Sequence, residues 1–67
     1  MIKVTRLNDT QIVINAELIE FVEETPDTVI TMTTGRKIVV KETIDEIIGT
    51  VIQYKRKIYS RIDHLAE

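Results

Sequence analysis

The stretch MTTGRKIVV, residues 32–40, places a single glycine between two runs of residues that favour β-strands. It predicts a β-hairpin over residues 28–40, with a three-residue loop at 33–35. In such a loop Gly35 takes the left-handed conformation, which glycine adopts without steric cost. A two-residue loop is the alternative, and it shifts the pairing of the strands by one residue.

The three-residue loop predicts apolar residues on both faces of this hairpin. Ile30 faces Ile38 on one side of the sheet, and Val29 faces Val39 on the other. A hairpin with one solvated face needs apolar residues on only one side. We therefore expect a second buried surface, formed within the chain or with another molecule.

Apolar and polar residues alternate in three further segments, which predicts strands over residues 2–7, 11–15 and 19–24. In the last of these, strict alternation places Ile19 and Phe21 on the same side. Together with the hairpin, these segments predict five short antiparallel strands within residues 1–41.

Turn-forming residues separate these strands. Asn8 and Asp9 both tolerate positive φ and predict a tight two-residue turn. Asn15 is a good cap for a single helical turn before the next strand. Pro26 fixes φ at the second position of a turn over residues 25–28.

A helix follows the strands, and its start is marked by a capping box between Thr43 and Glu46. From there to about residue 65 the apolar residues recur with a period near 3.6, which is typical of an amphipathic helix. The predicted fold class is α+β: a small five-stranded antiparallel meander sheet, curled and barrel-like, followed by one C-terminal amphipathic α-helix at about 43–65. Residues 1–67 form one domain in this prediction.

The predicted helix is longer than the sheet. About 22 residues at about 1.5 Å each give a helix of about 33 Å, whereas strands of this length span about 17–20 Å. Lys55 interrupts the apolar stripe, either as a side chain that reaches out to solvent or as a polar residue that sets the register of an oligomer. The predicted interaction surface consists of Val29, Val39, Tyr54, Lys55, Ile58, Tyr59, Ile62 and Leu65.

Size and composition favour a homo-oligomer. A chain of 67 residues has a small core, and it contains no cysteine and one histidine with which to form disulfides or a zinc site. The net charge of −2 argues against nucleic acid as the main partner, and we expect no membrane span and a cytoplasmic location.

The sequence shows no constellation that would support catalysis, a metal or a cofactor. Ser60 and His64 lie on the polar arc of the predicted helix, without the third group and oxyanion site that a nucleophile needs. The two glycines, Gly35 and Gly49, do not form a phosphate-binding loop. We expect a protein that is not an enzyme, with no catalytic residue, no metal and no cofactor.

The segments IKVTRLND and IVINAELIEFVEETPDTVITMTTGRKIVVKET, followed by a helix through IQYKRKI, resemble the FlbD family of small flagellar proteins, also called the swarming motility protein D family. The resemblance covers residues 1 to about 58. Family members usually have Asn-Gly in the first turn, where this chain has Asn8 and Asp9. The resemblance implies a cytoplasmic, non-enzymatic accessory of bacterial flagellar motility, at the base of the motor and in contact with motor or stator proteins.

An alternative interpretation is a small RNA-binding post-transcriptional regulator. The opening VTRL and the order of hairpins followed by a helix loosely resemble the carbon storage regulator. Its basic edge would consist of Lys3, Arg6, Arg36, Lys37 and Lys41. Acidic residues on neighbouring segments and the negative net charge weigh against this interpretation.

Overall fold

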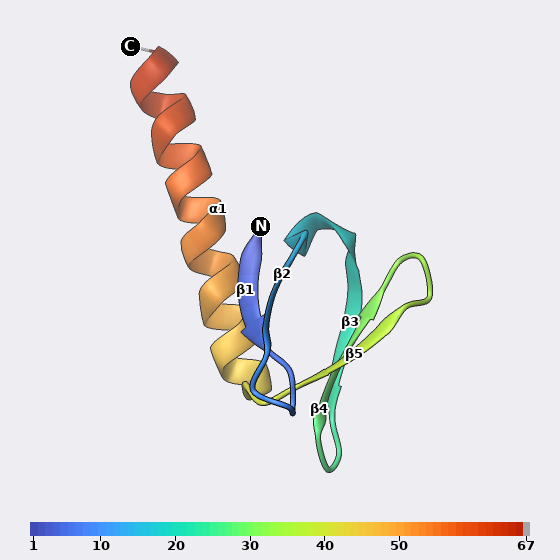
Figure 1. Ribbon diagram of the computed structural model, residues 1–67. Helices are drawn as coiled ribbons and strands as arrows, with labels where there is room; N and C mark the ends of the chain where they lie inside the picture. The colour runs from blue at the N-terminus through green and yellow to red at the C-terminus, as the bar shows by residue number, and fades with distance from the viewer. Residues whose placement is uncertain (67) are drawn as a thin grey trace.

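The computed structural model of the protein describes the backbone of residues 1–66 and the side chains of residues 1–58. In this part of the chain, five strands and a short 3-10 turn precede one long helix, which confirms the predicted α+β class (Figure 1). The elements are β1 (Ile2–Thr5), β2 (Gln11–Ile14), η1 (Ala16–Leu18), β3 (Ile19–Glu24), β4 (Thr28–Met32), β5 (Lys37–Val40) and α1 (Ile44–Ala66).

The strands form two antiparallel sheets, β1-β2 and β3-β4-β5, and not the single five-stranded sheet that was predicted. The break falls at η1, between β2 and β3. There the Asn15 side chain accepts a hydrogen bond from the N–H of Glu17 at 3.0 Å and caps the 3-10 turn, as predicted. Because this turn redirects the chain, β3 does not return alongside β2.

The two sheets meet at one corner, where the end of β1 approaches the end of β5. Arg6 and Val40 form an isolated antiparallel bridge. Next to it the N–H of Lys41 donates to the carbonyl oxygen of Thr5 at 2.8 Å. The N–H of Thr5 in turn donates to Oε1 of Glu42 at 2.9 Å. These contacts join β1 to the segment between β5 and α1.

The β4–β5 hairpin has the predicted three-residue loop and the predicted register. Ile30 pairs with Ile38, and Val29 pairs with Val39. Gly35 has φ of +91°, a conformation that residues with a Cβ rarely adopt. The identity of this one residue therefore fixes the register of the hairpin.

The β1–β2 hairpin uses the same kind of loop, so the predicted two-residue turn is wrong. The N–H of Arg6 donates to the carbonyl of Thr10, and the N–H of Asp9 donates to the carbonyl of Arg6, both at 2.9 Å. The loop therefore contains residues 7–9, and of these only Asp9 has positive φ, at 68°. The Asp9 carboxylate also forms an ion pair with Lys41 at the end of β5.

Strand β3 contains an irregularity that the alternation of its sequence does not reveal. The pairing with β4 shifts between Ile19 and Phe21, as in a β-bulge. Ile19 and Val22 consequently pack against the core, whereas Phe21 is 43% exposed. The prediction that Ile19 and Phe21 share a face is wrong, because the shift rotates Phe21 to the outside.

The turn predicted over residues 25–28 connects β3 to β4. Its Thr25–Pro26 peptide bond is cis. The hydroxyl of Thr25 donates to the carbonyl oxygen of Glu24 at 2.6 Å, at the point where β3 ends.

The core lies between the two sheets and the first turns of α1. Ile30 on the central strand β4 has no exposed surface, and Ile47 is the helix residue that enters the core most deeply. The buried hydrophobic residues are Ile2, Val4, Ile14, Ala16, Ile30, Met32, Ile38, Val40 and Ile47. This set is small for a protein that must offset the conformational entropy of its chain.

Helix α1 begins with the predicted capping box. The N–H of Glu46 donates to Oγ1 of Thr43 at 3.2 Å, and the N–H of Thr43 donates to Oε1 of Glu46 at 3.3 Å. A third contact comes from β3, whose Glu24 carboxylate accepts the N–H of Ile44 at 2.8 Å. The start of the helix is therefore attached to the sheet by a hydrogen bond as well as by packing.

The helix extends beyond both sheets, as predicted. It has 23 residues, which is about 35 Å at about 1.5 Å each. Its first turns lie against β1 and β3, and its second half projects past the strands (Figure 1). The resulting molecule is elongated, with extents of 46 × 22 × 19 Å.

We expect Glu42 to make the stability of the fold dependent on pH. Partial burial raises the pKa of its carboxyl. Hydrogen bonds from the backbone and hydroxyl of Thr5, and from its own N–H, outweigh this effect and hold the pKa below its ordinary value of 4.5. The ionised carboxylate thus stabilises the folded state above pH 4.5, and the contribution is lost as the pH falls through the lowered pKa.

Replacement of Glu42 by Gln tests this dependence. Urea unfolding at a series of pH values should show wild-type protein more stable than Glu42→Gln at about pH 7. The difference should shrink steadily below the ordinary pKa of 4.5. Glu17→Gln is the control, because this exposed glutamate lies in η1, away from the corner. A constant difference between wild type and Glu42→Gln across the acid range would contradict the assignment.

Thr31 on β4 should be replaceable by valine with a gain in stability. Its side chain is buried, at 5% exposure, and its Oγ1 has no hydrogen-bond partner among the described residues. Because valine keeps the shape without the hydroxyl, Thr31→Val should raise the free energy of unfolding by about 1 kcal/mol. Urea denaturation checks this, with the exposed Thr10→Val as control. Destabilisation by Thr31→Val would mean that the hydroxyl is satisfied.

Candidate interaction surfaces

An apolar groove of about 420 Å³ lies between β3 and the first half of α1. We call it the α1–β3 groove. Ile47 and Val51 of the helix lie at its inner side, where they contact the core. Phe21, Ile48 and Ile52 also line the groove, with 43%, 51% and 45% of their surfaces exposed. The groove therefore presents large apolar side chains to solvent.

The groove exists because the apolar stripe of α1 is wider than the surface that the sheets cover. Ile48 and Ile52 each follow a core-facing residue by one position, which rotates them by about 100° around the helix. Leaving a large apolar side chain in water is unfavourable by about 1.5–3 kcal/mol relative to its full burial. Contiguous exposed apolar side chains are common where proteins bind other molecules, which makes the groove a candidate interaction surface.

The predicted second face of the hairpin is only partly accessible. Val39 is 37% exposed, whereas Val29 is half-buried. The next residue on this face of β4, Thr31, is buried. The two valines pair with each other, as predicted, but only Val39 is exposed.

The helix residues of the predicted surface divide into two groups. Tyr54 packs against the core, Ile58 is half-buried and Lys55 is exposed. The side chains of Tyr59, Ser60, Ile62, His64 and Leu65 lie outside the described residues. The predicted interaction surface did not include Phe21, Ile48 or Ile52, although both isoleucines belong to the apolar stripe predicted for the helix. The two isoleucines could have been found, because a stripe about 160° wide exceeds what one sheet covers.

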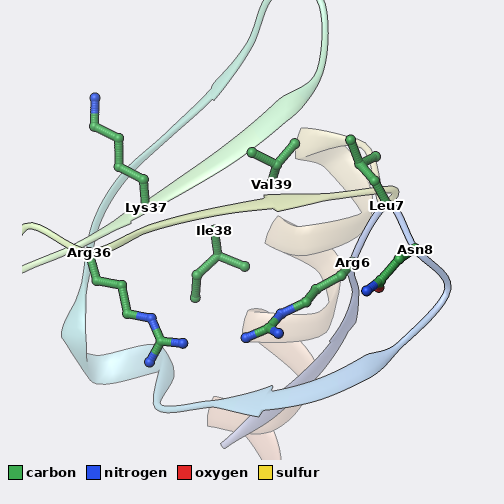
Figure 2. Close-up of a pocket in the computed structure, with 7 residues that line it drawn as sticks. All are labelled: Arg6, Leu7, Asn8, Arg36, Lys37, Ile38 and Val39. Atoms are coloured by element: carbon green, nitrogen blue, oxygen red, sulfur yellow. The ribbon is translucent and has the colours of Figure 1, made fainter.

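A second surface is a basic pocket of about 320 Å³ beside the outer edge of β5, which we call the β5 pocket. Arg36 precedes β5 and Arg6 follows β1, and both side chains extend over Ile38 into the same space (Figure 2). Lys37 points to the opposite side of the strand (Figure 2). Leu7, Asn8 and Val39 complete the lining.

The β5 pocket collects part of the basic edge predicted for the RNA-binding alternative. Arg6, Arg36 and Lys37 line the pocket together. Lys41 is instead paired with Asp9, and Lys3 lies beside the helix in a separate depression with Tyr54. The structure thus brings the side chains of Arg6 and Arg36 together and separates from them those of Lys3, Lys37 and Lys41.

Among the side chains of residues 1–58, His, Cys, Asp and Glu form no group of three that could hold a metal ion. Within residues 1–66, α1 is not apolar enough to span a membrane.

Fold and surfaces together define a small α+β protein that exposes an apolar groove and a basic pocket. The sequence profile of the FlbD family, described as flagellar and swarming motility proteins, matches residues 1–59, and the chain belongs to this family. The family resemblance seen in the sequence is confirmed, and it associates the protein with flagellar and swarming motility. Neither a curated protein nor a solved structure matched the chain.

Proposed function

We propose that the protein is a non-enzymatic accessory of bacterial flagellar motility. In this proposal it acts as a self-associating protein-interaction module that supports the motor or stator and thereby swarming, at the cytoplasmic base of the motor. Membership of the FlbD family supports the link to motility. The observation that carries the proposal of self-association is the α1–β3 groove, with its exposed Phe21, Ile48 and Ile52.

A second copy of the chain is the occupant that we propose for the α1–β3 groove. Apolar grooves of this kind accept the apolar face of an amphipathic helix. Each copy has such a helix, which extends past its own sheets (Figure 1). Two copies related by a two-fold axis can lay their helices in each other's grooves, so that the same surface is buried twice.

The position of Lys55 is compatible with this arrangement. Its side chain is exposed and lies within about 60° of Ile52 around the helix. A lysine at the edge of a helix–helix contact covers apolar surface with its stem and keeps the ammonium in water. In our proposal Lys55 therefore borders the contact between copies.

The RNA-binding regulator remains a second candidate, because Arg6, Arg36 and Lys37 share the β5 pocket. Phosphate contacts by these residues would give binding that weakens steeply with salt. The ion pair between Lys41 and Asp9 and the net charge of −2 weigh against it. An electrophoretic shift assay with pooled cellular RNA at several salt concentrations tests this candidate, and the absence of any shift would exclude it.

Self-association predicts that Ile48→Asp and Ile52→Asp reduce the oligomeric mass. A charge in the contact should weaken association about 10- to 100-fold for each buried isoleucine that is lost. Size-exclusion chromatography with light scattering measures the mass, and circular dichroism checks the fold. Both residues are about half exposed in the single chain, at 51% and 45%, so the variants should fold.

Two control variants separate loss of the contact from loss of the fold. Gln53→Asp places the same charge at an exposed position outside the groove, about 100° around the helix from Ile52, and should leave the mass unchanged. Ile47→Asp introduces a charge at a residue that is only 3% exposed and should unfold the protein. A wild-type protein that remains a monomer at about 100 μM, a concentration that saturates contacts of micromolar affinity, would refute self-association.

The link to motility can be tested in a swarming bacterium that lacks its own copy of the gene. Wild-type protein should restore the expansion rate of the swarm, and so should Gln53→Asp. Ile52→Asp should restore it poorly at equal protein level, because the contact between copies is weakened. Full restoration by Ile52→Asp would show that motility does not need self-association through this groove.

A further inference from the structure

The outer edge of β5 has a neighbouring strand at only one of its ends. β4 pairs along the other edge of β5 for its whole length. On the outer edge, Arg6 forms a single bridge with Val40, after which the chain turns away into the loop at residues 7–9. The β5 pocket lies where β1 leaves this edge.

The backbone of β5 offers hydrogen-bonding groups to this pocket. The N–H of Met32 donates to the carbonyl of Arg36 at 2.8 Å, so the backbone groups of Arg36 point toward β4. Successive residues of an antiparallel strand direct their N–H and C=O groups to opposite edges. Lys37 and Val39 therefore direct theirs outward, as the outward hydrogen bond of Lys41 to β1 confirms.

The charge of the pocket indicates an anionic occupant. The side chains of Arg6 and Arg36 extend into it, Lys37 lines it while its side chain points to the other side of β5, and no carboxylate lines it. Composition does not explain this segregation, since the chain has 11 acidic residues and 9 lysines and arginines. Neither arginine has an ion-pair partner among the described residues. Two guanidinium groups that share one space repel each other unless a negative charge lies between them.

We propose that the outer edge of β5 binds an acidic, extended segment of another protein by strand addition. The backbone of the segment would pair with the outward groups of Lys37 and with the outward N–H of Val39. Its carboxylates would bind the guanidinium groups of Arg6 and Arg36. The inference rests on the proposed function only in taking the partner to be a protein, and it uses a surface separate from the α1–β3 groove.

A peptide fits this surface better than RNA does. An exposed strand edge presents alternating donors and acceptors, which complement the backbone of another strand. Single-stranded RNA is bound by stacking its bases on aromatic side chains, and no aromatic residue lines the β5 pocket. The apolar side chains of Leu7 and Val39 instead suit the side chains of an added strand.

A labelled synthetic peptide of alternating Glu and Val, about eight residues long, is a suitable probe, since a strand of this length spans β5. Fluorescence anisotropy should show saturable binding, and the same peptide with Lys in place of Glu should not bind. Arg6→Glu and Arg36→Glu should each weaken binding about tenfold, the loss expected for one charge-assisted hydrogen bond. Arg56→Glu, an exposed change on α1, should leave it unaltered.

Val39→Pro tests the backbone contact separately from charge. Proline removes an N–H that points outward, so the pairing with β4 should survive, as circular dichroism can verify. Peptide binding should fall at least tenfold in this variant, the loss expected when a strand-addition hydrogen bond is removed. Val39→Thr keeps the N–H and should bind as wild type does. Equal binding by folded Val39→Pro would overturn strand addition.

Two further outcomes would overturn the proposal: no saturable peptide binding by wild-type protein, or displacement of the peptide by an unstructured oligoribonucleotide at lower concentration than by unlabelled peptide. Repeating the titration with Ile52→Asp keeps the result separate from self-association. Unchanged peptide binding by this variant is expected, because the two surfaces do not share residues. Loss of binding there would refute an independent β5 site.

Discussion

The contact between the end of β1 and the end of β5 holds the two sheets together. It consists of one bridge between Arg6 and Val40 and the adjoining hydrogen bonds of Thr5 with Lys41 and Glu42. β2 and β3 do not pair. The backbone contacts at this corner therefore join the two sheets and close one side of the core. The same corner leaves the rest of the β5 edge unpaired. The contact that joins the two sheets therefore also determines which part of the β5 edge is free to bind a partner.

Local chemistry made much of this fold predictable from the sequence. A glycine in a three-residue loop fixes the β4–β5 register, and Thr43 with Glu46 marks the start of α1. Two features escaped prediction. The shift between Ile19 and Phe21 leaves the alternation of the sequence intact, since a bulge depends on pairing with β4. The separation into two sheets depends on how far η1 redirects the chain, which its three residues do not reveal.

The candidate surfaces were predictable only in part, because both arise from tertiary arrangement. Ile48 and Ile52 belong to the predicted apolar stripe, but which part of a stripe a sheet covers depends on where the helix lies. Arg6 and Arg36 were recognised as members of a basic group. Their convergence over Ile38 follows from the pairing of distant segments, which the spacing of the sequence does not contain (Figure 2). The chain belongs to the FlbD family of flagellar and swarming motility proteins, and both surfaces support the proposal that it acts through contacts with other chains.

Three consecutive residues at the start of α1 bind three different parts of the molecule. Glu42 bonds to β1, Thr43 bonds within the helix, and Ile44 bonds to Glu24 of β3. The start of the long helix is thus attached to both sheets by polar contacts, in addition to the packing of Ile47 in the core. In the proposed assembly, the angle at which each copy presents its helix to the other therefore depends on residues 42–44 as well as on the hydrophobic core.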